Sequence, residues 1–214
     1  MSSYLDLYDY RVQVAALYRE RNRTLVEGED PASVLERFRE GRNALFASHA
    51  QSALDEEQRR VFTGLRYFPY NGALCLEAEL DTEVEPKRQS VAMNADESMM
   101  MTTVGQLHFV VELQPVTLSL YWLEIYGGGL FLPFRDTTCP ELSYGAGRYL
   151  FDTIKGSDFL WGSGGTGKRM VLDFNYAYNP SCAYNDRWFC PLAPAENRLQ
   201  VPIRAGEMNY KVEE

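Results

Sequence analysis

The stretch ALCLEAELD, residues 73–81, decides the fold. Its apolar residues Leu74, Leu76, Ala78 and Leu80 occupy every second position, and the positions after Leu76 that separate them carry carboxylates. A period of two is the mark of a β-strand with one buried face and one polar face. Antiparallel sheets commonly have one face on the core and one in water, so this stretch predicts an antiparallel strand.

Seven further segments outward from this stretch read as strands, and turn residues separate nearly all of them. They are residues 88–94, 98–104, 106–112, 116–126, 130–135, 148–153 and 170–175. Because no helical stretch lies between them, a closed or nearly closed antiparallel sheet is favoured over a parallel α/β fold. We predict a mainly β (α+β) fold, an antiparallel β-barrel or strongly curved sheet.

The segments that flank the sheet differ from it in pattern. Leu5, Tyr8, Val12 and Ala15 recur at helical spacing, and Asp30-Pro31 supplies an N-cap and first-turn proline for a second helix. Prolines at 180, 191, 194 and 202 exclude long regular elements after residue 175. We predict one domain: two to three N-terminal helices in residues 1–62, the sheet in 63–175 and an irregular C-terminal wrap in 176–214.

Composition limits the classes of partner. The formal net charge of −9 argues against a nucleic-acid partner, because phosphate binding requires clustered Lys and Arg. The most apolar run, residues 116–134, contains Glu124 and alternates in hydropathy, which predicts a hairpin and no membrane partner. The N-terminus has no apolar signal segment, so we expect a cytoplasmic location with the four cysteines reduced.

One motif imitates a phosphate-binding loop. GSGGTGK, residues 162–168, has the spacing of such a loop, but Arg169 follows where the motif needs Ser or Thr. The next residues alternate like a strand, whereas a phosphate loop leads into a helix. The motif is interpreted as a hairpin loop, and no cofactor is expected.

Candidate site residues are concentrated in the last third of the chain. Those suited to holding a ligand are Arg135, Tyr144, Arg148, Asn175, Tyr178, Asn179, Tyr184 and Asn197. Candidates for an acid, base or nucleophile are Asp136, Asp173, Cys182 and Glu196, although no base is visibly paired with the thiol. No metal site is expected, because the cysteines lack neighbouring histidines.

Several motifs together resemble the family catalogued as domain of unknown function 1684. They are FREGRNALFASHAQSAL (38–54), FTGLRYFPYN (62–71), LFLPFRDTT (130–138), YGAGRYL (144–150), LDFNYAYNPSCAY (172–184) and CPLAPAENRLQVPIRAGE (190–207). The resemblance covers about three quarters of the chain in the expected order. It implies no established activity, so the shared residues are candidates without assigned roles.

Two interpretations of the candidate residues remain. In the first, a barrel mouth binds a small polar or anionic molecule, with Arg135 and Arg148 on the ligand and a hydrolase or lyase reaction as one option. In the second, the same residues form a non-catalytic structural or interaction network that locks the C-terminal coil onto the sheet. The exposure of the two arginines distinguishes these interpretations, since a binding residue must line an open cavity.

Overall fold

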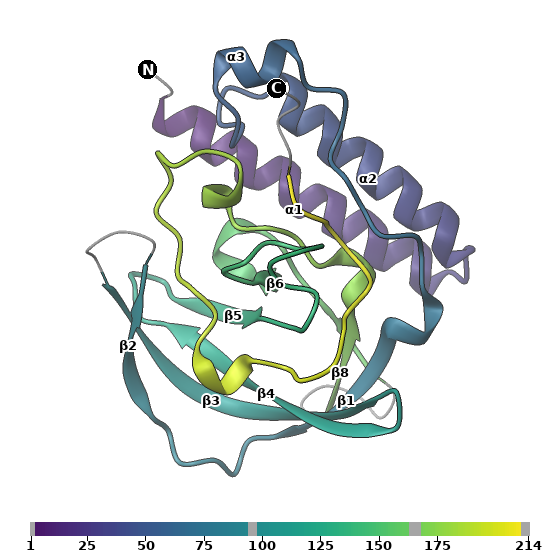
Figure 1. The fold of residues 1–214 in the computed structure, drawn as a ribbon, viewed down its shortest axis with the longest axis vertical. Helices are drawn as coiled ribbons and strands as arrows, with labels where there is room; N and C mark the ends of the chain where they lie inside the picture. The colour runs from purple at the N-terminus through teal and green to yellow at the C-terminus, as the bar shows by residue number, and fades with distance from the viewer. Residues whose placement is uncertain (1–2, 94–97, 163–167, 211–214) are drawn as a thin grey trace.

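A computed structural model describes residues 3–93, 98–162 and 168–210. Its centre is one strongly curved antiparallel sheet, which confirms the predicted fold class (Figure 1). The strands are β1 (Cys75–Asp81), β2 (Arg88–Ala92), β3 (Ser98–Val111), β4 (Gln114–Leu123), β5 (Gly129–Phe134), β6 (Arg148–Asp152), β7 (Leu160–Trp161) and β8 (Arg169–Asp173). Their order is β6-β5-β4-β3-β1-β8-β7, and β2 also pairs with β3.

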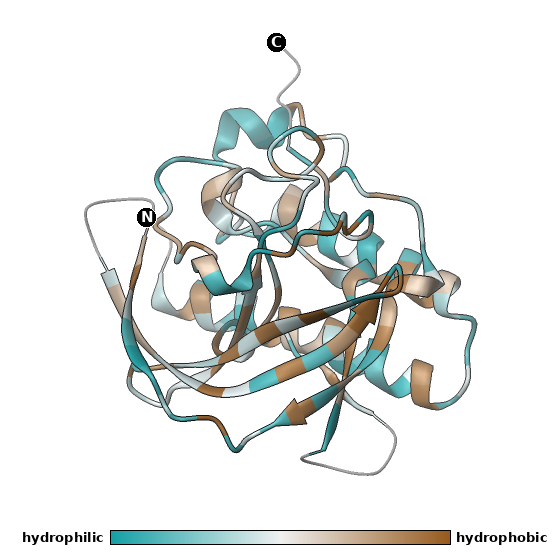
Figure 2. Ribbon diagram, turned by 60° about the horizontal axis from the view of Figure 1, so that its bottom comes forward, coloured by the Kyte–Doolittle hydropathy of each residue, from teal (hydrophilic) through white to brown (hydrophobic). Residues whose placement is uncertain are grey.

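The stretch of residues 73–81 forms β1, between β3 and β8. Leu80 pairs with Leu107 of β3, and Ala78 pairs with Met170 of β8. Ala78, Leu107 and Met170 are fully buried. The alternation expected from the sequence therefore describes the real faces of the sheet, and teal and brown alternate along the long strands in Figure 2.

The two strands predicted at 98–104 and 106–112 are one strand, β3. A bulge between Thr103 and Gly105 interrupts its pairing with β4 without ending it. A Cβ on Gly105 would lie 2.9 Å from Leu80 Cδ1, so glycine is present here because β1 approaches closely. The two-residue strand β7 was not predicted, because so short a segment carries no periodic signal.

Three helices precede the sheet within the described residues: α1 (Tyr4–Val26), α2 (Pro31–Ser48) and α3 (Glu56–Arg60). Asp30 caps α2 as predicted by accepting a hydrogen bond from the Ser33 amide. The predicted inner face of α1 is wrong, because Leu5 and Tyr8 are 78% and 68% exposed. The face that packs against α2 and the coil instead carries Val14 and Tyr18, both buried.

The C-terminal coil occupies the inside of the curve (Figure 1). Leu199, Val201, Ile203 and Ala205 are buried in the same apolar cluster as Leu107 and Leu118 of the sheet. Apolar burial of this kind is the main favourable term in folding. The inside of the curved sheet is thus packed with residues of its own chain.

The sheet stays open between β6 and β7, and the coil bridges part of the gap. Tyr149 of β6 and Tyr178 exchange two backbone hydrogen bonds of 2.8 and 2.9 Å. The loop that imitates a phosphate site lies largely outside the described residues, at 163–167. Among the helices that are described, none has the length and apolar character needed to cross a membrane.

Candidate functional site

Arg148 is fully enclosed, with no exposed surface. Its Nη1 donates to the carbonyl oxygens of Ala205 and Glu207, and its Nη2 donates to the carbonyl of Ile203. Nη2 also pairs with Asp136 Oδ1 at 3.1 Å. Both terminal nitrogens are saturated by the coil and by Asp136, so Arg148 faces no cavity and has no donor left for a ligand at either nitrogen.

Three asparagines on the candidate list join segments that are distant in sequence. Asn197 donates to the carbonyls of Ser119 and Pro133, which ties the coil to β4 and β5. Asn175 exchanges hydrogen bonds with the backbone of Asn71. Asn179 donates through its side-chain amide to the carbonyl of Met208. A buried amide that satisfies backbone groups in this way holds irregular chain in place.

The four candidates for catalysis do not converge. Asp136 accepts hydrogen bonds from Arg148 and from the Ile203 amide, and Glu196 accepts one from Tyr121. Asp173 caps the turn at Asn175, whereas Cys182 lies beside the hydroxyl of Tyr144 at 3.7 Å. Within the described part of the chain, no three His, Cys, Asp or Glu side chains group as metal ligands would.

Arg135, the second arginine expected to bind a ligand, precedes Asp136 in the chain but does not line the cavity described below. Its backbone pairs with the coil, donating to the Asn197 carbonyl and accepting from the Leu199 amide. The structure therefore does not bring Arg135 and Arg148 to one open site. The inside of the sheet, where a barrel-mouth ligand was expected, holds the coil instead.

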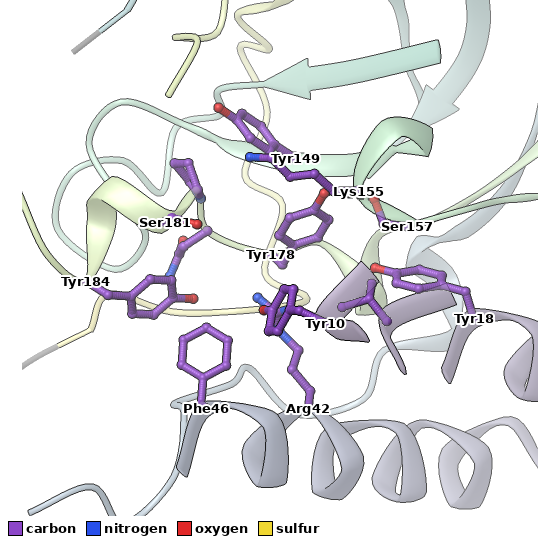
Figure 3. Close-up of a pocket in the computed structure, with 13 residues that line it drawn as sticks. Tyr10, Tyr18, Arg42, Phe46, Tyr149, Lys155, Ser157, Tyr178, Ser181 and Tyr184 are labelled. Atoms are coloured by element: carbon purple, nitrogen blue, oxygen red, sulfur yellow. Dashed lines mark hydrogen bonds between the residues drawn. The ribbon is translucent and has the colours of Figure 1, made fainter. Parts of the chain in front are cut away.

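A cavity does exist between the helices and the start of the coil (Figure 3). Its volume is about 50 Å³, and it is partly open to solvent. Its walls come from α1, α2, the turn after β6 and residues 178–184. The lining residues are Tyr10, Val14, Tyr18, Arg42, Phe46, Tyr149, Lys155, Ser157, Tyr178, Asn179, Pro180, Ser181 and Tyr184.

Arg42 lines this cavity and pairs with Glu207, which is buried behind the wall. Arg42 Nε donates to Glu207 Oε1 at 2.5 Å, and the guanidinium carbon lies 5.0 Å from the ring centres of Phe46 and Tyr178. Glu207 Oε2 accepts from the Asn179 amide at 2.8 Å and from the Tyr184 hydroxyl. Three segments of the chain, namely α2, residues 179–184 and the coil at Glu207, therefore meet at one carboxylate, and buried charges of this kind are stable only when so paired.

The opposite wall is built on the turn after β6. The Ser157 hydroxyl lies 2.8 Å from the Tyr178 hydroxyl and donates to the Asp152 carbonyl. Lys155 stands at the rim with its Nζ 4.0 Å from Asp152 Oδ2 and is half exposed. This wall therefore presents hydroxyl groups inside and a cation at the edge.

The tyrosines of the cavity stay protonated at neutral pH. Burial raises the pKa of Tyr18 to about 12, and burial raises the pKa of Tyr178 further above its ordinary value. For Tyr184, burial and then the negative charge of Glu207 raise the pKa. A protonated phenol has one hydrogen to donate; Tyr184 donates it to Glu207 and Tyr178 donates it to Ser157, so these two hydroxyls hold the wall together.

Sequence reasoning found Tyr178, Asn179 and Tyr184 of this cavity and missed its helical wall. Arg42 lies four residues after Phe38 and three before Leu45, both of which are buried. A cation at that spacing falls on the apolar face of the helix. This spacing identifies Arg42 as an inward-facing cation, but the candidate residues were taken from the last third of the chain.

The fold and the sequence both have relatives. A solution NMR structure of an uncharacterised protein of Haloarcula marismortui matches with a TM-score of 0.62 and 30% identity, over 85% of this chain and 96% of that one. No curated protein matches the sequence. The sequence model of one family, described as a protein of unknown function (DUF1684), matches residues 60–208. The chain therefore belongs to the DUF1684 family.

Proposed function

We propose that the protein binds a small anionic or polar molecule in the cavity between the helices and the coil. The observation that carries this proposal is the charge of the lining. Arg42 and Lys155 line the cavity together with five tyrosines, and the described lining residues include no Asp or Glu. In a chain of net charge −9, such a wall favours an anion over a cation.

Arg42 has donor capacity to spare. Only its Nε has a hydrogen-bond acceptor within the described ranges, the carboxylate of Glu207. The terminal nitrogens of a guanidinium form a planar fork that matches a carboxylate or phosphate. An anionic group placed beside Tyr10 would use this fork and accept a hydrogen bond from the Tyr10 hydroxyl as well.

Asn179 adds an acceptor to the same wall. Its residue is 2% exposed, and its Oδ1 is buried without a donor among the residues described. Leaving a buried acceptor unpaired costs about 1–3 kcal/mol. A ligand that carries a hydroxyl or amine beside its anionic group would satisfy this oxygen, which favours hydroxy or amino acids over simple anions.

Native mass spectrometry of the freshly purified protein tests the proposal. We expect a bound small molecule that is retained in Lys87→Met, an exposed lysine outside the cavity, and lost in Lys155→Met. Arg42→Lys keeps a charge facing Glu207 but removes the planar fork, so it should also lose the ligand.

Two results would count against binding. The first is a wild-type protein that carries no molecule and whose Tm is unchanged by phosphate, sulfate and a panel of small carboxylates, because a ligand of the native state raises Tm. The second is loss of the ligand in Arg135→Met with full retention in Lys155→Met, which would place the molecule elsewhere.

A second candidate function is a non-catalytic structural or interaction domain. The saturated contacts of Arg148 and Asn197 favour it, because these residues hold the coil on the sheet. Under this alternative the cavity is a packing space, and Lys155→Met leaves every measured property of the protein unchanged.

A further inference from the structure

A second cavity adjoins the first and contains a thiol. It shares Tyr10, Lys155 and Ser181 with the first cavity, and Cys190 is part of its wall. Trp188 and Phe189 extend this wall, so the cavity is more apolar than its neighbour. None of the ligand contacts proposed above uses Cys190.

Cys190 is held beside Cys182. The Cys182 amide donates to Cys190 Sγ at 3.4 Å, and the Cys182 thiol donates a hydrogen bond to the same sulfur. Both residues are buried, and the Tyr144 hydroxyl lies 3.7 Å from the Cys182 sulfur. The two thiols are therefore neighbours, and Cys190 follows Cys182 by eight positions.

These contacts shift the pKa values of the two thiols in opposite directions. The hydrogen bond from Cys182 and, more weakly, the positive charge of Lys155 lower the pKa of Cys190 against the opposing effect of burial. Donating that hydrogen bond raises the pKa of Cys182. A thiolate is the reactive form of cysteine, so Cys190 is the nucleophile of the two.

We propose that Cys190 attacks low-molecular-weight disulfides that enter the second cavity, and that Cys182 resolves the product. The carrying observations are the hydrogen bond from the Cys182 amide to Cys190 Sγ and the position of Cys190 in a cavity wall beside Lys155. The proposal does not rest on the anion site, although the two cavities share Lys155.

The exchange balances without a further reagent. The Cys190 thiolate attacks one sulfur of RSSR, the S–S bond breaks, and RS⁻ leaves and takes up a proton. Cys182 then loses its proton to solvent, and its thiolate attacks Cys190 Sγ. The second RS⁻ leaves as the Cys182–Cys190 bond forms. Two protein thiols are oxidised by two electrons, and one disulfide is reduced to two thiols.

The other two cysteines provide internal controls. Burial and then the charge of Asp173 raise the pKa of Cys75 to about 12, although this residue is exposed. Cys139 contacts Ser143 and Asp136. At pH 7, native protein should be alkylated by iodoacetamide at Cys190 at least about tenfold faster than at Cys75, because each pKa unit changes the thiolate fraction by up to tenfold.

Oxidised glutathione is the probe for the exchange. Native protein should release two glutathione thiols per chain and show a Cys182–Cys190 disulfide in non-reducing peptide mass mapping. Cys182→Ser keeps a hydrogen-bond donor but removes the resolving sulfur, so it should trap one glutathionyl group on Cys190. Cys190→Ser should lower modification of Cys182 by at least about tenfold, with circular dichroism confirming that each variant is folded.

Three results would overturn the proposal. They are no adduct on Cys190 in folded Cys182→Ser, modification of Cys75 or Cys139 before Cys190 in native protein, and unchanged modification of Cys182 in Cys190→Ser. Protein in urea, where all four thiols are accessible, shows in each case that the reagent is active.

Discussion

At the scale of the single residue, Arg148 is the strongest link between the sheet and the coil. It pairs with Asp136 with neither side chain exposed, and it donates to three coil carbonyls. Arg148→Met keeps the length of the side chain but leaves Asp136 charged and unpaired. We expect the free energy of unfolding to fall by about 3–5 kcal/mol, the usual cost of breaking a buried pair on one side. Urea unfolding followed by circular dichroism measures it.

Arg135→Met is the matched control for that variant. The backbone of Arg135 pairs with the coil, and its side chain has no ion pair within the described residues. The free energy of unfolding should change by no more than about 0.5 kcal/mol. Equal losses in both variants would show that general loss of positive charge, and not the buried network, lowers stability.

The residue scale also shows what sequence reasoning achieves for a site. The last third of the chain was singled out because Arg, Asn and Asp crowd together there, and the structure buries Arg148, Asn175, Asn179 and Asn197. Their separation into a sealed network around Arg148 and a cavity wall at Tyr178 could not be predicted. It depends on which side of the coil faces the sheet, and the irregular backbone there has no fixed period.

At the scale of the element, the coil after β8 depends on one left-handed glycine. Gly206 has φ +74°, and a Cβ there would lie 2.4 Å from the Ala177 carbonyl oxygen. Gly206→Ala adds this clash to the cost of a left-handed residue. Gly28 has φ +84° and nothing within 4 Å of a built Cβ, so Gly28→Ala carries the conformational cost alone.

Comparison of these two variants isolates the close packing of the coil. Gly206→Ala should destabilise the protein by roughly 1–3 kcal/mol more than Gly28→Ala, which is the usual cost of overpacking. Thermal and urea unfolding of both variants provide the measurement. Equal free energies of unfolding for the two variants would mean that the coil moves away from Ala177 without a loss of stability.

The regular elements were predictable, and the coil was not. Long strands such as β3 and β4 contain enough alternating residues to be recognised in the sequence. Asp30-Pro31 marks the start of α2 because Asp caps a helix and Pro fits its first turn. The inner face of α1 was misplaced because Leu5 and Tyr8 suggest an apolar stripe that the structure leaves exposed. Which stripe is buried is decided by α2 and the coil, which are remote in sequence.

At the scale of the whole molecule, buried phenols link stability to alkaline pH. Burial raises the pKa values of Tyr18, Tyr149, Tyr178 and Tyr184 above the ordinary value near 10. A pKa that is higher in the folded state gives a contribution that is fully present below the unfolded pKa. That contribution is lost as pH rises through about 10 and toward the folded values.

The protein should therefore unfold cooperatively above about pH 10, with tyrosinate absorbance rising as circular dichroism is lost. The two signals, recorded in one titration, check the linkage. Full ionisation of all 14 tyrosines while the circular dichroism stays native would contradict it. Tyr178→Phe removes one of these phenols, so in the same titration the variant should unfold at a higher pH, provided that packing compensates for the lost bond to Ser157. An unchanged midpoint would show that Tyr178 does not contribute to the linkage.

The filling of the curved sheet by residues 199–205 has a consequence for synthesis on the ribosome. Helices and strands leave the exit tunnel first, but Glu207, which pairs with Arg42 across 165 positions, leaves among the last. Until then the concave face of the sheet is bare apolar surface. Domains in general begin to fold from the N-terminus during synthesis, and exposed apolar faces at that stage attract chaperones or aggregate. This chain should therefore remain a chaperone client until residues 199–207 have left the tunnel and can cover the sheet.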